Sequence, residues 1–233
     1  MGAVVAPALI IAASACAMVF AIMLWKKVAA VSLDYRGSHS TMDMDNELAD
    51  VDAERGNALS PMAESFQKLR TIYSDIRTGA RAFLYAEYLM CAAFLLAFGL
   101  LLFVLVSRLE SGWDFQVGLL TALAFCVGGV TSMVAGYVGM MVAVFANART
   151  TVSAMERPDS RAWTASFNCA FRAGGVMGYA LAGVGLLTLY VLISVYAAIF
   201  DVSLGTEEAL RLFECVAGFG LGGSAIALFG RVG

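Results

Sequence analysis

Five long apolar blocks constrain this chain more than any other feature of its sequence. They cover about residues 3–25, 82–106, 115–146, 173–200 and 209–231. A helix crosses the hydrocarbon core of a bilayer with about 20 apolar residues, so each block is long enough to span a membrane. Of the 233 residues, 61% are hydrophobic and only 14% are charged, which excludes an ordinary soluble domain. The sequence therefore predicts an all-α, polytopic transmembrane bundle with about five spans and a lipid bilayer as its surroundings.

The first block also has the small-residue pattern of a signal-peptide cleavage site, at Ala13, Ser14 and Ala15. Signal peptides carry positive charge before the apolar region, whereas here Lys26 and Lys27 follow it. We therefore interpret the block as a retained first span. From Pro61 onward, apolar residues recur at helical spacing, which predicts a surface helix leading into the second span.

The distribution of basic residues predicts the orientation in the membrane. Segments 26–81 and 147–172 contain twelve of the 15 lysines and arginines. Because basic residues concentrate on the cytosolic side, the loop 26–80 and the connection 147–172 are expected in the cytosol. The N-terminus then lies in the opposite, lumenal compartment, and the end of the fifth span returns to the cytosolic side.

Small residues recur at four-residue spacing in three of the blocks, which places them on one face of each helix. Such faces let membrane helices pack closely, so we expect helix–helix contacts there. The residues are Gly128, Ser132 and Gly136 in the third block, Gly174, Gly178 and Ala182 in the fourth, and Gly218 and Gly222 in the fifth.

The chain contains no complete set of catalytic or metal-ligating residues. His39 is the only histidine, and the five cysteines form no C-x-x-C pair, so packing is the expected role of the cysteines. The acidic stretch 43–55 lacks the spacing of a calcium loop and is interpreted as a solvated loop. A net charge of −3 gives no indication of a nucleic-acid partner.

Ionisable residues near membrane depth are the remaining candidates for function. We expect Glu87 to be an interfacial residue paired with Arg81 or another basic neighbour, and Arg172 to extend towards the cytosolic surface. Arg231 follows an uninterrupted apolar stretch, residues 216–230, and the sequence stops two residues later. We interpret this stop as a truncation within a membrane helix. Arg231 then lies inside a span or is an interfacial arginine at its cytosolic end.

Several segments resemble membrane-integral inorganic pyrophosphatases of the vacuolar, proton-translocating type. Residues 79–88 (GARAFLYAEY) are similar to the entrance of that family's second span. Residues 129–140 (GVTSMVAGYVGM) with 146–151 (ANARTT) resemble the third, 170–178 (AFRAGGVMG) the fourth and 220–233 (GLGGSAIALFGRVG) the fifth. The matches occur in the family's order and spacing, so the whole chain, 1–233, is expected to be the N-terminal part of one membrane domain.

The resemblance implies about five spans of a larger sixteen-helix fold that forms a homodimer. It implies hydrolysis of magnesium pyrophosphate on the cytosolic side, coupled to proton transport into a vacuole or acidocalcisome-type compartment. Magnesium is the implied cofactor, bound by residues outside this chain, and potassium is a further candidate ion.

Two residues take roles by the same resemblance. Arg231 occupies the position of the arginine that links the hydrolytic centre to the ion gate, and Ser224 matches a small polar residue near the ion site. The family's substrate motif would begin just beyond Gly233. No catalytic or metal-binding residue is therefore expected in this chain, which alone should be inactive.

Two other functions remain open from the residues themselves. One is a non-enzymatic polytopic membrane scaffold. The other is part of a secondary transporter, which would require an inverted repeat or interrupted spans.

Overall fold

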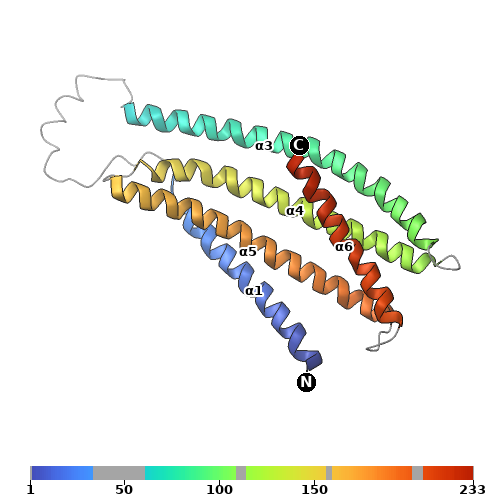
Figure 1. Cartoon of the computed structure of the whole chain (residues 1–233). Coiled ribbons are helices and arrows are strands. Elements are labelled where there is room, and N and C mark those ends of the chain that lie inside the picture. Colours follow the sequence, from blue (N-terminus) through green and yellow to red (C-terminus); the bar gives the residue numbers. More distant parts are fainter. Residues whose placement is uncertain (1, 34–60, 109–113, 156–158, 201–206, 233) are drawn as a thin grey trace, which may run out of the picture.

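The computed structural model describes residues 2–33, 61–108, 114–155, 159–200 and 207–232, and all regular elements in these ranges are helices. The helices are α1 (Gly2–Ala29), α3 (Pro61–Ser107), α4 (Phe115–Ser153), α5 (Asp159–Phe200) and α6 (Glu207–Val232), shown in Figure 1. All five are long and apolar enough to cross a membrane, which confirms the predicted all-α bundle with five apolar helices. His39 and the acidic stretch 43–55 lie outside the described residues.

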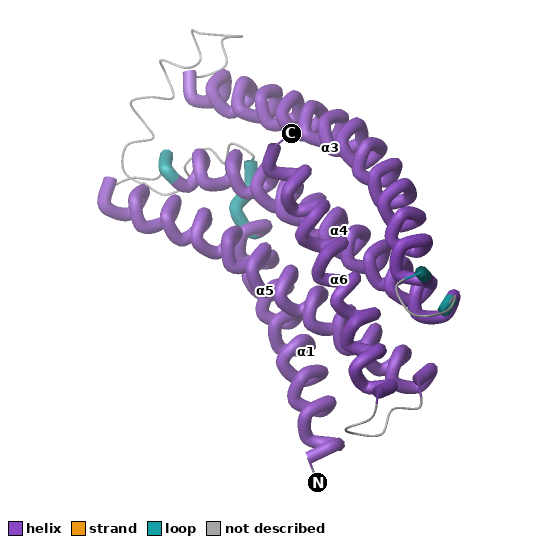
Figure 2. The backbone as a smooth tube through the Cα atoms, turned by 45° about the vertical axis from the view of Figure 1, so that its right-hand side comes forward, coloured by secondary structure: helices purple, strands orange, loops and turns teal. Residues whose placement is uncertain are grey.

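Helix α4 is the centre of the arrangement. It packs against α3, α5 and α6, whereas α1 packs mainly on α5. In Figures 1 and 2, α3 lies on one side of α4, α5 and α1 lie on the other, and α6 crosses α4 obliquely. The position of α6 is therefore set chiefly by its contact with α4.

Three helices are much longer than a bilayer requires. Helix α3 has 47 residues, α4 has 39 and α5 has 42. At a rise of 1.5 Å per residue they are about 60 to 70 Å long, roughly twice the hydrocarbon thickness. All three extend beyond α1 at the end of the bundle where α1 finishes with Lys26 and Lys27. We call this the basic end, and the opposite end, where α3 meets α4 and α5 meets α6, the turn end.

These lengths change the loops expected from hydropathy. The predicted helix from Pro61 is confirmed, but it continues without a break into the second span, so residues 61–80 of the expected loop 26–80 are helical. Most of the expected connection 147–172 is also helical, because α4 runs to Ser153 and α5 starts at Asp159. Falling hydropathy marks where lipid contact ends, whereas a helix satisfies its own backbone hydrogen bonds in water as well.

A cluster of buried side chains holds the basic end together. It contains Val28 from α1, Val142 and Ala146 from α4, and Cys169, Ala173 and Val176 from α5. Beside it, the rings of Trp25 and Phe145 stack with centroids 4.2 Å apart. The guanidinium carbon of Arg149 lies 3.4 Å from the centre of the same Phe145 ring. The aromatic contact joins α1 to α4, and the cation–π contact lies within α4.

All five cysteines are free thiols, and three of them, Cys91, Cys169 and Cys215, are buried among apolar neighbours. This arrangement agrees with the predicted packing role, since a free cysteine behaves as a small apolar side chain in a core.

Candidate functional site

The turn end fixes where α6 begins. Asp114 precedes α4, and its Oδ1 accepts hydrogen bonds from the backbone N–H groups of Gln116 and Val117, at 3.2 and 3.3 Å. The Oδ2 of the same carboxylate lies 3.3 Å from Nη1 of Arg211 in α6. One aspartate therefore caps α4, satisfying donors that a helix start leaves free, and also binds α6 to that start.

The same end is packed and hydrogen bonded in its interior. Leu120, Ala124, Leu192, Tyr196, Leu212 and Cys215 form one buried cluster from α4, α5 and α6. The hydroxyl group of Tyr196 donates a hydrogen bond of 2.6 Å to the backbone carbonyl of Leu120, within this cluster. A buried hydroxyl needs such a partner, so the contact orients α5 against α4.

Glycines bring the backbones of α4 and α6 into direct contact. We call Gly128 of α4 with Gly218 and Gly222 of α6 the glycine seam. A Cβ atom on Gly218 would lie 2.6 Å from the carbonyl oxygen of Thr121, and one on Gly128 would lie 2.8 Å from the carbonyl carbon of Phe219. The predicted small-residue packing of the third and fifth spans is therefore confirmed at these three positions.

For the fourth span, no close contact is found at Gly174 and Gly178 among the described residues, so the prediction stays untested there. A Cβ atom at either position would meet nothing within 4 Å. The glycines of α5 that pack closely are Gly175 and Gly183, both against α1. A Cβ on Gly183 would lie 3.2 Å from the carbonyl oxygen of Ser14. Two small-residue faces are interleaved in this helix, and spacing alone does not say which of them has a neighbour.

Ser224 lies on the side of α6 that the other described helices leave uncovered. We call this side the outer face of α6, and it carries exposed Leu210, Phe213, Leu221, Ser224 and Leu228. Leu210, Phe213 and Leu228 are each 63% exposed. Side chains this apolar and this exposed are suited to contact with lipid or with further protein.

Arg231 is in the last turn of α6, and its side chain is outside the described part of the chain. It follows Ser224 by seven residues, which is about two helical turns, so its position falls on the same outer face by register. The structure thus brings the two positions predicted as ion-pathway residues to one side of one helix.

Glu87 differs from its prediction. No ion pair joins it to Arg81 in the described residues, and its Oε1 atom is buried without a hydrogen-bond partner. The reason is helical geometry, because residues six apart lie on different faces, whereas neighbours on one face are three or four apart. Glu87 instead lines a cavity of about 470 Å³ between α3, α4, α5 and α6.

The sequence contains a signal for this cavity that the interpretation of Glu87 as an interfacial residue does not use. Ser132 and Gly136 of α4 both line it, and small residues leave room between helices. The neighbouring Tyr88 is held by a hydrogen bond of 2.6 Å from its hydroxyl group to the backbone carbonyl of Met133. A carboxylate one residue from a fixed tyrosine, opposite small residues, indicates a polar cavity in the bundle.

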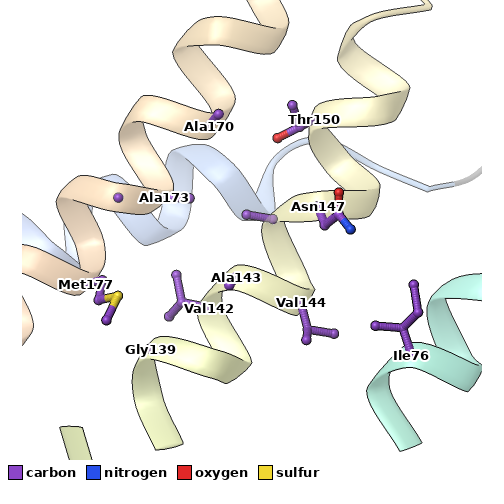
Figure 3. A pocket seen from close by; sticks show the side chains of 12 residues that line it. Ile76, Gly139, Val142, Ala143, Val144, Asn147, Thr150, Ala170, Ala173 and Met177 are labelled. Atoms are coloured by element: carbon purple, nitrogen blue, oxygen red, sulfur yellow. The ribbon is translucent and has the colours of Figure 1, made fainter. Parts of the chain in front are cut away.

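A second cavity, of about 510 Å³, lies nearer the basic end (Figure 3). Its walls come mainly from α4 and α5, with Ile76 of α3 on one side. Asn147 and Thr150 are its polar side chains, and the rest of the lining is apolar. With no titratable side chain in its walls, this cavity offers neither an acid–base pair nor a charged ligand for a metal ion.

The described residues do not fit a magnesium–pyrophosphate site. They contain no group of three or more histidine, cysteine, aspartate or glutamate side chains that could hold a metal ion. Magnesium in phosphate-handling sites is bound by carboxylates together with substrate phosphates. We therefore assign no chemical step at such a metal to this part of the chain.

Comparison with known proteins places these helices in a family. The model of the inorganic H+ pyrophosphatase family matches residues 15–233. The chain belongs to this family. The packed helices α3 to α6 and the glycine seam are therefore features of an H+ pyrophosphatase membrane domain.

Relatives with assigned names agree with this membership. The chain is 36% identical over 167 residues to the "K(+)-insensitive pyrophosphate-energized proton pump" of Pyrobaculum aerophilum, covering 72% of this chain and 21% of the relative. It is 35% identical over 171 residues to "Pyrophosphate-energized membrane proton pump 3" of Arabidopsis thaliana, covering 70% and 21%. A proton pump of the same kind from Moorella thermoacetica is 31% identical over 166 residues, covering 71% and 21%. The match thus spans about a fifth of the length of each of these pyrophosphate-energised pumps.

Proposed function

We propose that the full-length protein is a pyrophosphate-energised proton pump. It hydrolyses magnesium pyrophosphate on the cytosolic side of a membrane and moves protons into a vacuole or acidocalcisome-type lumen. The observation that carries this proposal is the family match over residues 15–233, supported by three relatives whose names state pyrophosphate-energised proton pumping. The protein acts as a homodimer, with magnesium bound by residues outside this chain and potassium as a further candidate ion.

The orientation follows from charge. The basic end carries Lys26 and Lys27 together with Arg149 and Arg161, and basic residues favour the cytosolic side. In this orientation the basic end faces the cytosol, and the start of α1 lies in the lumen. The fifth span, α6, then runs from the lumenal surface towards the hydrolytic side.

The outer face of α6 is the part of this chain that takes part in coupling. Ser224 and Arg231 share this face by register, and the rest of the pump covers it along the ion pathway. An arginine stays protonated at any physiological pH. Arg231 can therefore interact with the anionic hydrolytic centre on one side and with a carboxylate of the ion gate on the other. Its fixed charge transmits the state of the first site to the second.

The role of Arg231 is tested in the full-length protein by Arg231→Ala. We expect proton transport to fall more than pyrophosphate hydrolysis, because the coupling charge is lost while the catalytic residues remain. Arg231→Lys is the matched control, since it keeps the charge without the planar guanidinium group. Proton transport equal to that of the unmodified pump in Arg231→Ala would disprove the proposed coupling.

The 233 residues alone should not hydrolyse pyrophosphate. The described part has no cluster of three or more histidine, cysteine, aspartate or glutamate side chains that could hold the metal, so we expect no magnesium-dependent phosphate release from the purified chain. Measurable release from this chain alone would contradict our assignment of the catalytic residues to the remainder of the pump.

A further inference from the structure

Helix α4 is packed in two parts, with a less packed segment between them. Its buried residues extend from Gly118 to Gly129 and begin again at Gly139, so residues 130–138 include none that is buried within the described bundle. A helix that is packed along its whole length buries a residue about every three or four positions. The gap is therefore a real interruption in packing, and we call residues 130–138 the middle segment of α4.

The middle segment separates the two packed ends of the bundle. Towards the turn end, Leu120, Ala124 and Phe125 of α4 belong to buried clusters that include α3, α5 and α6. Towards the basic end, Val142 and Ala146 belong to the cluster that includes α1 and α5. Helix α6 is therefore attached to the first part of α4, whereas α1 lies beside the second part.

The backbone of the middle segment has an additional hydrogen-bond partner. The hydroxyl group of Tyr88 in α3 donates to the backbone carbonyl of Met133, at 2.6 Å. In an α-helix this carbonyl accepts from the N–H group four residues later, which belongs to Tyr137. The same N–H group also interacts with the Tyr88 oxygen. The hydroxyl group thus lies beside one hydrogen bond of the helix, and groups inserted at such bonds are a known cause of helix kinks.

Small residues leave room for bending in the same segment. Ala135 lines two cavities of the described bundle, one of about 40 Å³ against α5 and the one of about 470 Å³ beside Glu87. A Cβ atom on Gly136 would lie 3.1 Å from the hydroxyl oxygen of Tyr88, so glycine allows this hydroxyl group to approach the helix backbone. The weak point in packing, the additional hydrogen-bond partner and the small residues therefore coincide.

We propose that the middle segment is a hinge in α4, and that the Tyr88 hydroxyl group keeps the Met133 carbonyl hydrogen bonded when the helix bends. A hinge in a membrane needs such a substitute, because an unpaired backbone group in the bilayer is strongly unfavourable. Bending here tilts the first part of α4, together with α6, relative to α1 and the basic end. The hinge concerns the motion of these helices and does not rest on the proposed pump function.

The test is amide hydrogen–deuterium exchange of the full-length protein in lipid nanodiscs, resolved to single amides by mass spectrometry. After correction for intrinsic rates, we expect the middle segment to exchange severalfold faster than residues 119–129, because exchange requires local opening of the helix. In Tyr88→Phe, opening leaves the Met133 carbonyl without its substitute partner. Exchange of the Tyr137 amide should then slow by about two- to tenfold, the effect of one hydrogen bond.

Tyr196→Phe is the matched control. Its hydroxyl group donates to the carbonyl of Leu120 in the same helix, but within a buried cluster, so its loss should leave exchange of the Tyr137 amide unchanged. Gly136→Ala should slow the Tyr137 amide, as Tyr88→Phe does, because alanine favours the regular helix. Comparing one amide between variants cancels differences in its access to water.

Unchanged or faster exchange of the Tyr137 amide in Tyr88→Phe would overturn the proposal, because it is expected if the tyrosine only holds α3 against α4. Equal protection of the middle segment and residues 119–129 in the unmodified protein would overturn it as well. The experiment uses no pyrophosphate and measures no transport, so its outcome is independent of the proposed pump function. Correct folding of each variant is checked by size-exclusion chromatography in detergent.

Discussion

Replacing Gly222 with alanine inserts a methyl group where α6 crosses α4. The new Cβ atom would lie 2.8 Å from the carbonyl carbon of Phe125 and 3.0 Å from the backbone nitrogen of Gly129. Carbon atoms in favourable contact are about 3.5 to 4.0 Å apart, so the seam must open by about 1 Å. Both obstacles are backbone atoms, which cannot rotate away as a side chain would. Overpacking of this kind costs about 1–3 kcal/mol.

Gly220→Ala is the matched control for the contact with α4, because a Cβ atom there meets no atom of the described chain within 4 Å. Both substitutions add the same methyl group to the same helix, and both gain about 1 kcal/mol of helix propensity. This gain cancels in the comparison. We therefore expect Gly222→Ala to be less stable than Gly220→Ala by the packing term alone, about 1–3 kcal/mol.

The assay is unfolding of the full-length protein in mixed detergent micelles, followed by circular dichroism as the denaturing detergent is increased. The difference in unfolding free energy between the two variants is the quantity compared. Equal stability of the two proteins would refute the backbone contact at the glycine seam. A large loss in both would instead show that α6 tolerates no added methyl group at either position.

Three further substitutions test other contacts, each by the same unfolding measurement. Asp114→Ala should lower the free energy of unfolding by about 1 kcal/mol, because the helix cap of α4 is lost. Arg211→Ala should lower it less, because a partly exposed ion pair contributes about 0–1 kcal/mol. Equal losses in the two variants would contradict the double role of the aspartate. Tyr196→Phe removes the hydroxyl group that donates to a backbone carbonyl of α4 and should cost about 0.5–1.5 kcal/mol, and no change would show that this hydrogen bond adds nothing. Gly183→Leu should separate α1 from α5 and destabilise the protein, while Gly185→Leu, which meets open space, should be tolerated; the reverse order would place α1 elsewhere.

The membrane fold follows from the sequence because the bilayer leaves a chain few choices. A segment of about 20 apolar residues must satisfy its backbone within itself, which in practice means a helix. Gly128, Gly218 and Gly222 are predictable as packing residues for a similar reason. A face of small residues on a membrane helix mainly allows another helix to approach closely.

The features that the sequence did not predict depend on which helices are neighbours in the folded chain. Gly175 and Gly183 pack on α1, whereas Gly174 and Gly178, with similar spacing, meet no atom of the described chain within 4 Å. The helices also continue beyond the apolar blocks, since α4 runs to Ser153 although its apolar block ends at position 146. Hydropathy reports the surroundings of a residue and carries no direct information on its backbone hydrogen bonds.

The candidate site shows the same difference between features that a local sequence pattern predicts and features that require the assembled helices. Ser224 and Arg231 were selected by family resemblance, and helical register alone places them on one face of α6. The cavity beside Glu87 requires four helices to be assembled, so the small residues of α4 indicate room between helices but do not define the cavity by themselves. Pairing Glu87 with Arg81 was a local argument, and it failed because a separation of six residues directs the two side chains to different faces.

Proton transport driven by pyrophosphate is the most direct test of the proposed function. The full-length protein is reconstituted in sealed vesicles, and magnesium pyrophosphate is added outside while a pH-sensitive dye reports the interior. We predict acidification that requires pyrophosphate hydrolysis and collapses when an uncoupler is added. Vesicles that neither hydrolyse pyrophosphate nor acidify, although they contain folded protein with its basic end outward, would contradict the account.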